Sequence, residues 1–173
     1  SGKTAAFVLP ALNRVLAARG DASKRRDNKT VHGPRVLVLT PTRELAMQVA
    51  KATDGYGRHV PGLRVTTIVG GVPYHAQLKA LRGPLDVLIA TPGRLMDHMA
   101  SGKAVLANVE MLVLDEADRM LDMGFIDDIK HIASFLPEQR QTVMFSATFA
   151  GEVGQLAKNM LKAEAQTIAV STH

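Results

Sequence analysis

Acidic side chains follow one apolar run of this chain directly. The run Met111–Leu114 leads into Asp115, Glu116 and Asp118. A carboxylate at a strand end can hold Mg²⁺, and a neighbouring carboxylate can position or deprotonate a water molecule. Acidic residues are also common at an ordinary helix start, where they interact favourably with the helix dipole. By itself, this segment predicts either a magnesium site or a helix N-terminus.

The first four residues, Ser1, Gly2, Lys3 and Thr4, match the second half of a phosphate-binding P-loop. In such a loop the glycine lets the backbone approach phosphates, the lysine reaches the β- and γ-phosphates, and the threonine hydroxyl coordinates Mg²⁺. Without the first half of the motif the signal is weak when it stands alone. A strand ending in carboxylates on the same chain strengthens the case for a nucleotide site.

Three more segments follow apolar runs and lead into helix starts. Their residues are Pro41, Thr42 and Arg43; Thr91, Pro92, Gly93 and Arg94; and Ser146, Ala147 and Thr148. Taken singly, each hydroxyl is more simply a helix N-cap, and Gly70–Gly71 is a turn. Together, helix-start amides, hydroxyls and arginines suit a phosphodiester backbone, and they predict binding that does not depend on base sequence.

Strands and helices must alternate to place these segments. Nearly all-apolar runs predict strands over 35–40, 64–69, 86–90, 111–114, 141–145 and 167–170. Apolar side chains at three- and four-residue spacing predict helices over 5–19, 45–52, 125–136 and 153–161. This alternation predicts one α/β domain with a mainly parallel sheet that is covered on both faces.

Composition narrows the class of protein. The chain has 173 residues, 46% of them apolar, which excludes a disordered tail as the main content. It has no cysteine, which excludes disulfides and Cys-type zinc sites. A net charge of +5 permits a polyanionic partner, and no apolar run has the roughly 18–20 residues of a membrane helix. His75, His98 and His131 lack metal-ligand spacing and are expected at the surface or on helix faces.

The motifs in this order, Gly–Lys–Thr, PTRELA, GG, TPGR, DEAD and SAT, resemble those of the DEAD-box ATP-dependent RNA helicase family. The resemblance covers essentially the whole chain, as the first of the family's two RecA-like domains, and it has a bacterial RhlE-type character. It implies a RecA-like P-loop NTPase fold with helices on both faces of the sheet. It also implies ATP and Mg²⁺ as cofactors, RNA as a partner, a cytoplasmic location and no membrane association.

The same resemblance implies a role for each motif. The residues expected to bind ATP are Ser1, Gly2, Lys3, Thr4, Asp115, Glu116 and Asp118, with Thr4 and Asp115 at the Mg²⁺. Those expected in catalysis are Lys3, Asp115, Glu116, Ser146 and Thr148, with Glu116 acting on the attacking water. Those expected along the RNA backbone are Pro41, Thr42, Arg43, Gly70, Gly71, Thr91, Pro92, Gly93 and Arg94. Asp118 would couple to Ser146 and Thr148.

Two departures from the family pattern shape the expected activity. The sequence begins within the P-loop, without the preceding strand or the adenine-reading Q motif. We therefore expect a fragment with an open gap in the sheet beside the strand that ends at Ser146, and an incomplete phosphate cradle. The family's second RecA-like domain, which supplies an arginine finger worth roughly 10³–10⁵ in rate, is also outside the sequence. These departures predict negligible ATPase activity of the isolated chain.

Three alternatives stay open at this point. A DNA helicase of related fold would share the same phosphate contacts, because only the 2′-hydroxyl distinguishes RNA. A non-catalytic clamp would not need Glu116, Ser146 and Thr148. A small-molecule P-loop kinase would share Lys3 and Asp115 but would not need PTRELA, GG and TPGR together.

Overall fold

The apolar runs of the sequence form one parallel sheet. Its strands are β1 (Val36–Leu39), β2 (Val65–Ile68), β3 (Val87–Ala90), β4 (Met111–Leu114), β5 (Gln141–Ser146) and β6 (Thr167–Ser171). The computed structural model describes residues 2–20, 33–102, 104–160 and 167–171, with side chains over 8–17, 33–58, 60–102 and 104–160. The strands pair in the order β2-β3-β1-β4-β5-β6, and every neighbouring pair is parallel. The predicted α/β class with a parallel sheet is confirmed.

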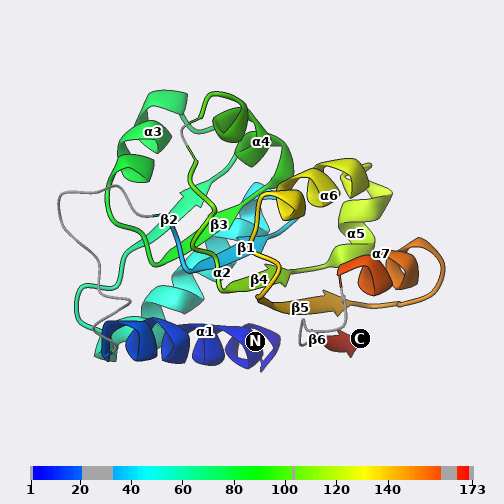
Figure 1. The fold of residues 1–173 in the computed structure, drawn as a ribbon, viewed down its shortest axis with the longest axis horizontal. Coiled ribbons are helices and arrows are strands. Elements are labelled where there is room, and N and C mark those ends of the chain that lie inside the picture. Colours follow the sequence, from blue (N-terminus) through cyan, green and yellow to red (C-terminus); the bar gives the residue numbers. More distant parts are fainter. Residues whose placement is uncertain (1, 21–32, 103, 161–166, 172–173) are drawn as a thin grey trace.

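Helices connect the strands (Figure 1). They are α1 (Gly2–Gly20), α2 (Arg43–Tyr56), the 3-10 helix η2 (Gly57–His59), α3 (Tyr74–Arg82), α4 (Pro92–Ala100), α5 (Ala117–Asp122), α6 (Ile126–Ser134) and α7 (Glu152–Met160). The periodicity of the sequence predicts α1, α2, α6 and α7, and the structure confirms these four. It does not predict α3, whose contacts are described below.

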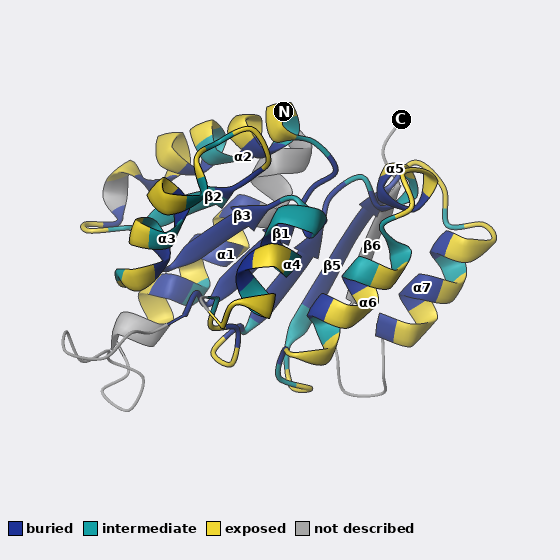
Figure 2. Ribbon diagram, turned by 90° about the horizontal axis from the view of Figure 1, so that it is seen from above, coloured by how far each residue is buried: buried dark blue, intermediate teal, exposed yellow. Residues whose placement is uncertain are grey.

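Two cores lie on opposite faces of the sheet, because alternate strand residues point to opposite sides. Val36 and Val38 of β1 pack with α1 and α2 on one face. Leu37 and Leu39 pack with helices α3 to α7 on the other. Figure 2 shows the buried strands between these two helical layers. Since both faces are covered, β1, β3 and β4 are buried along their whole length, as the apolar runs predict.

The predicted gap in the sheet is wrong. Next to β5, where we expected an unpaired edge, β6 pairs in parallel register, from Thr142 opposite Thr167 to Ser146 opposite Ser171. The outer backbone groups of β5 thereby gain hydrogen-bond partners, as buried backbone groups require. At the start of β5, Arg14 of α1 donates two hydrogen bonds to the Gln141 side-chain carbonyl, at 3.1 and 2.8 Å. Helix α1 is therefore anchored to this strand.

The parallel arrangement brings all strand ends to one edge of the sheet. Every candidate motif that follows a strand therefore lies along the carboxyl edge, where α/β sheets bind ligands. Within the described residues, no helix combines the length and the apolar character that a membrane span requires.

Candidate functional site

The order of the strands sorts the candidate motifs into two neighbouring groups. Gly70–Gly71 follows β2, Thr91–Arg94 follows β3 and Thr42–Arg43 follows β1, and these three strands are adjacent. Asp115 and Glu116 follow β4, and Ser146 ends β5, which are the next two strands. The expected RNA-contacting motifs thus share one half of the carboxyl edge, and the expected hydrolytic motifs share the other.

The acidic pair at the end of β4 has two different environments. Asp115 is 2% exposed, and its amide donates to the Leu39 carbonyl of β1 at 2.9 Å. Glu116 is half-buried and adopts φ +53°, the one positive φ of a non-glycine residue in the described chain. Its carboxylate lies 3.9 Å from Arg119 Nη1. A left-handed conformation outside glycine costs roughly 1–2 kcal/mol, and such strain is found most often at functional sites.

Ser146 joins the acidic segment to the end of β5. Its hydroxyl accepts a hydrogen bond from the Asp118 amide at 3.3 Å and donates one to the Thr148 carbonyl at 2.6 Å. Ser146 is fully buried, whereas Thr148 is exposed and its own hydroxyl accepts from the Ala150 amide at 3.1 Å. The structure therefore brings Asp118, Ser146 and Thr148 together, through the backbone of Asp118 rather than its carboxylate. Ser146 is not the helix cap that a single-residue interpretation predicts.

The segment after β1 meets the turn after β2. Thr42 caps α2, because its hydroxyl accepts from the Leu45 amide at 3.2 Å, so the simple N-cap interpretation is confirmed here. The Arg43 side chain reaches the α-carbon of Gly71: a Cβ built on Gly71 would lie 2.8 Å from Arg43 Nη1. Pro41 is buried, so its side chain offers little surface to a ligand.

The segment after β3 also contacts the turn after β2, through the side chain of Arg94. Thr91 is the N-cap residue of α4, as the simple interpretation predicts, but its hydroxyl makes no capping hydrogen bond. Arg94 Nη1 donates to the Val72 carbonyl at 3.0 Å, and Arg94 Nε lies 4.0 Å from Asp97. Pro92 is buried at the first helical position, where its missing N–H costs nothing. Gly93 is half-buried in the first turn of α4, at a position whose amide has no partner within the helix.

The P-loop residues are only partly described. Ser1 lies outside the described residues, and α1 begins at Gly2, so Lys3 and Thr4 belong to its first turn. The side chains of these residues are likewise outside the described part. A helix that starts at a glycine still suits the phosphate-binding interpretation, because the first amides of a helix can bind an anion.

The acidic groups at this edge fit Mg²⁺ better than a metal with an all-protein cage. Among the described residues, no three His, Cys, Asp or Glu side chains cluster tightly enough to hold an ion. Nucleotide-associated Mg²⁺ is usually held by one or two carboxylates together with the substrate phosphates. A buried aspartate at a strand end, with a second carboxylate beside it, is compatible with that requirement.

Three polar residues near this edge are buried, which the sequence did not predict for any of them. Thr40, at the end of β1, is fully buried, and its hydroxyl has no hydrogen-bond partner among the described residues. Gln77 and His98 are also buried and contact each other. Of the two expectations for His98, a helix face is confirmed, because His98 lies in α4, and a surface position is wrong. A buried polar residue leaves no local periodic signal, and only the tertiary structure identifies these three.

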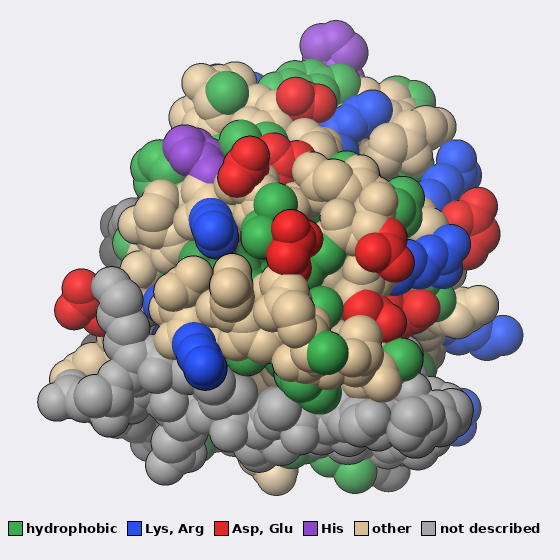
Figure 3. Space-filling view, turned by 90° about the vertical axis from the view of Figure 1, so that its right-hand side faces the viewer, with side chains coloured by type: hydrophobic (Ala, Val, Ile, Leu, Met, Phe, Trp, Pro, Cys, Tyr) green, Lys and Arg blue, Asp and Glu red, His purple; other side chains and the backbone are tan. Residues whose placement is uncertain are grey.

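The surface on the side of α5, α6 and α7 is less suited to bind a polyanion. The face formed by α5, α6 and α7 mixes acidic and basic side chains (Figure 3). Its exposed residues include Asp122, Asp127 and Glu152 beside Lys130 and Lys158. Such a mixture gives no field of a single sign.

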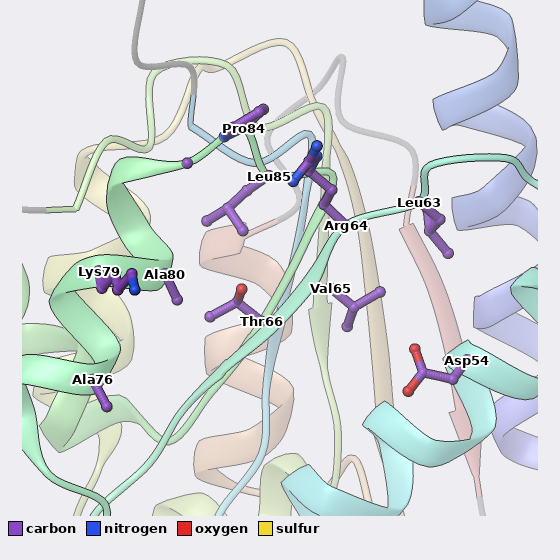
Figure 4. A pocket seen from close by; sticks show the side chains of 11 residues that line it. Asp54, Leu63, Arg64, Val65, Thr66, Ala76, Lys79, Ala80, Pro84 and Leu85 are labelled. Atoms are coloured by element: carbon purple, nitrogen blue, oxygen red, sulfur yellow. The ribbon is translucent and has the colours of Figure 1, made fainter.

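A groove of about 550 Å³ lies between α2, the edge strand β2 and α3 (Figure 4). Asp54, Arg64 and Lys79 line it, and none of the candidate motif residues does. Strand β2 is short and flanked by cations, which are features that discourage an edge strand from pairing with another chain. The groove therefore offers no support for the nucleotide or nucleic-acid site.

Comparison with known proteins identifies relatives over nearly the whole chain. The model of the DEAD/DEAH box helicase family matches residues 1–156. The ATP-dependent RNA helicase DeaD of Buchnera aphidicola subsp. Schizaphis graminum is 43% identical over 162 residues, which cover 94% of this chain and 25% of that protein. DeaD of Escherichia coli K12 is 42% identical over 162 residues, which cover 94% of this chain and 24% of that protein.

The fold is also found in a crystal structure of a hypothetical ATP-dependent RNA helicase from Sulfolobus tokodaii. The TM-score is 0.78 at 37% identity, with 98% of this chain and 45% of that chain covered. The chain thus spans about a quarter of the length of the curated relatives that it matches. The finer RhlE-type resemblance stays a prediction.

Proposed function

Because the chain belongs to the DEAD/DEAH box helicase family, we propose that it is the ATP-binding half of an RNA-dependent ATPase that unwinds or remodels RNA. The observation that carries this proposal is the order of the strands. It gathers the three segments expected to contact phosphates on one half of the carboxyl edge and the acidic and serine segments on the other half. With both groups on one domain, hydrolysis could be coupled directly to a bound strand.

On the nucleotide side, Ser1, Gly2 and Lys3 would bind the phosphates of ATP through backbone amides and the lysine ammonium. Thr4 and Asp115 would hold Mg²⁺, which supplies charge neutralisation at the β- and γ-phosphates when bound. Glu116 would position the attacking water or accept its proton. The burial of Asp115 and the adjacent, half-buried Glu116 support this division of roles.

On the RNA side, the contacts would be made to the backbone rather than to bases. The Gly70 and Gly71 amides have no hydrogen-bond partner among the described residues, and the Gly93 and Arg94 amides in the first turn of α4 precede the first amide that bonds back to Thr91. Arg43 is exposed beside this turn. Free amides and an arginine suit phosphate oxygens and carry no base information, so the binding would be independent of sequence.

The link between the two halves would run through the segment after β5. Ser146 contacts both the Asp118 amide and the Thr148 carbonyl, so a shift of Thr148 would reach the helix that follows Glu116. In a two-state ATPase such a contact lets ATP and RNA favour the same arrangement. Asp118 and Thr148 would then act in coupling rather than in bond cleavage.

We further propose that residues 1–173 form a single RecA-like domain that works with a second one. The relatives are about four times as long as the matched segment, which leaves room for further domains. An arginine finger from such a domain is worth roughly 10³–10⁵ in rate. The isolated chain would therefore hydrolyse ATP at a negligible rate. A cytoplasmic location belongs to the same proposal.

The test is ATP hydrolysis by the full-length protein that carries these residues, with Glu116→Gln as the matched control. Hydrolysis would be measured without nucleic acid, with unstructured RNA and with DNA of the same sequence. Stimulation by RNA alone, lost in Glu116→Gln, is the expected result. Equal stimulation by DNA would favour the DNA helicase, and RNA binding without stimulation would favour a clamp.

A further inference from the structure

The buried side chain of Gln77 connects the two segments expected to contact RNA. Gln77 lies in α3 and is 3% exposed. Its Nε2 donates to the Val69 carbonyl at 2.7 Å, at the end of β2. Its Oε1 accepts from Arg94 Nη1 at 3.3 Å and lies 3.0 Å from His98 Nε2. One side chain therefore joins the turn after β2 to helix α4.

These contacts fix the orientation of the amide and the tautomer of the histidine. Val69 offers only a carbonyl, so the nitrogen of the Gln77 amide must face it, and the oxygen must face Arg94 and His98. A carbonyl oxygen can only accept, so His98 must donate from Nε2. His98 Nδ1 is then the bare acceptor nitrogen, which agrees with its having no hydrogen-bond partner among the described residues. The hydrogen bonds that Gln77 makes to Val69, Arg94 and His98 therefore have one consistent assignment.

The contact with Val69 also orients the next amide. The peptide bond between Val69 and Gly70 is trans, like every peptide bond in the described chain, so its carbonyl and its N–H point in opposite directions. Since the carbonyl points inward to buried Gln77, the Gly70 N–H points away from the core. Gly70 and Gly71 are exposed, and their amides have no partner among the described residues.

Arg94 is held by the same group. Its Nη1 donates to the side-chain carbonyl of Gln77 and to the backbone carbonyl of Val72, the residue that follows the Gly70–Gly71 turn. His98 is backed by Tyr74, whose ring stacks on it with a centroid distance of 4.2 Å and an interplanar angle of 5°. The Tyr74 and Ser101 hydroxyls lie 2.9 Å apart, and Ser101 bonds the His98 carbonyl at 3.0 Å. His98, which contacts Gln77, is thus held by Tyr74 of α3 and by Ser101 at the end of α4.

We propose that Gln77 is a positioning residue that holds the Gly70–Gly71 turn and Arg94 in the arrangement that binds an RNA phosphodiester backbone. This inference rests on the proposed function and adds to it a residue that would not touch the RNA. Affinity is gained when the binding groups are ordered before the ligand arrives, because less conformational entropy is then lost on binding. Without Gln77, the turn amides and Arg94 would each have to be ordered by the RNA.

The first test replaces Gln77 by Met in the full-length protein, since methionine has a similar length and no hydrogen-bonding amide. The matched control is Thr53→Val, which removes a buried hydroxyl that bonds the Val49 carbonyl at 2.7 Å in α2, outside the motif segments. We expect Gln77→Met to raise the RNA concentration for half-maximal ATPase about tenfold. In Gln77→Met, the KM for ATP and the kcat at saturating RNA should stay near wild type. In Thr53→Val, these two quantities and the RNA concentration for half-maximal ATPase should all stay near wild type.

A second readout separates positioning from general destabilisation. The logarithm of the affinity for a labelled single-stranded RNA falls linearly with the logarithm of the salt concentration, with a slope of about −0.7 per neutralised phosphate. If Arg94 loses its phosphate contact in Gln77→Met, the slope becomes less steep by about 0.7. Thr53→Val should retain the wild-type slope even if its thermal midpoint falls as far as that of Gln77→Met.

Gln77→Glu serves as a second variant in case Gln77→Met does not fold. Its carboxylate still accepts from Arg94 but cannot donate to Val69, so we expect the wild-type salt slope with a raised RNA half-saturation. Unchanged RNA half-saturation in the folded variants, or a shift matched by Thr53→Val, would overturn the proposal. Failure of RNA to stimulate the wild type would overturn the proposed function instead, and direct RNA binding by Gln77→Met and Thr53→Val would then decide the role of Gln77.

Discussion

Arg43 Nη1 lies 2.8 Å from the point that a Cβ on Gly71 would occupy, so an arginine from one motif covers the backbone of another. The two residues come from the ends of β1 and β2, which are separated in the sheet by β3. Gly71 adopts φ +81°, which glycine accepts at no steric cost. The backbone conformation therefore favours glycine at position 71, and any Cβ there would move the exposed Arg43 guanidinium aside.

Substitution at the two glycines should have unequal effects. Gly71→Ala should lower the free energy of unfolding by about 1–2 kcal/mol, because an alanine at positive φ is strained and its Cβ displaces Arg43. Gly70 has no atom within 4 Å of a built Cβ and no positive φ, so Gly70→Ala should stay within about 0.5 kcal/mol of wild type. Urea unfolding of both variants checks this difference. Equal stability of the two would show that the turn adapts freely.

The buried hydroxyl of Ser146 should contribute to stability as well as to coupling. Ser146→Ala leaves the Asp118 amide and the Thr148 carbonyl without their partner, and the expected loss is about 1–2 kcal/mol in the free energy of unfolding. Thr148→Val removes an exposed hydroxyl and should change the same quantity by no more than about 0.5 kcal/mol. Denaturant titrations of the two variants provide the comparison, and a silent Ser146→Ala would contradict the proposed link.

Glu116 should be a position where function is maintained at the expense of stability. Glu116→Gly relieves a left-handed conformation, which offsets the extra chain entropy of glycine, so the unfolding free energy should change by less than about 0.5 kcal/mol. RNA-stimulated hydrolysis should be abolished. Lys130→Gly, at an exposed site within α6, should instead cost about 1 kcal/mol and leave hydrolysis unchanged. A comparable loss of stability in both variants would mean that Glu116 is not strained.

Stability should fall in mild acid because of His98. Burial, and then repulsion from Arg94, lower the pKa of His98 below its ordinary 6.5, while Asp97 acts in the opposite direction. The unfolded imidazole therefore takes up a proton at a higher pH than the folded one, and the unfolded state binds more protons below about pH 6.5. The free energy of unfolding then decreases as the pH falls through this range.

Chemical unfolding at pH 7.5 and 5.5 measures this dependence. His98→Gln should reduce the loss of stability between the two pH values, since glutamine does not titrate. His131→Gln provides the comparison, because it makes the same substitution at an exposed position on α6. A wild-type pH dependence in His98→Gln would assign the effect to another group.

Much of the fold could be predicted from local patterns. The apolar run Met111–Leu114 is a strand with the predicted bounds, and the three- and four-residue spacing in 153–161 corresponds to α7 (Glu152–Met160). These signals are local because each depends on neighbouring residues along one strand or one helix. Helix α3 lacks a comparable signal: it has no acidic residue in its first turn and no side-chain cap, and its buried Gln77 bonds to residues of other elements.

The sequence by itself determined the motifs, their order, and hence the family and the class of sheet, because residue type and short-range spacing carry that information. Only the tertiary structure decided which motifs are neighbours, since the strand order β2-β3-β1-β4-β5-β6 differs from the order along the chain. It also decided the pairing of β6 with β5, the left-handed conformation of Glu116 and the burial of Gln77 and His98. These features depend on hydrogen bonds and packing between elements far apart in the sequence, which leave no periodic trace in either partner.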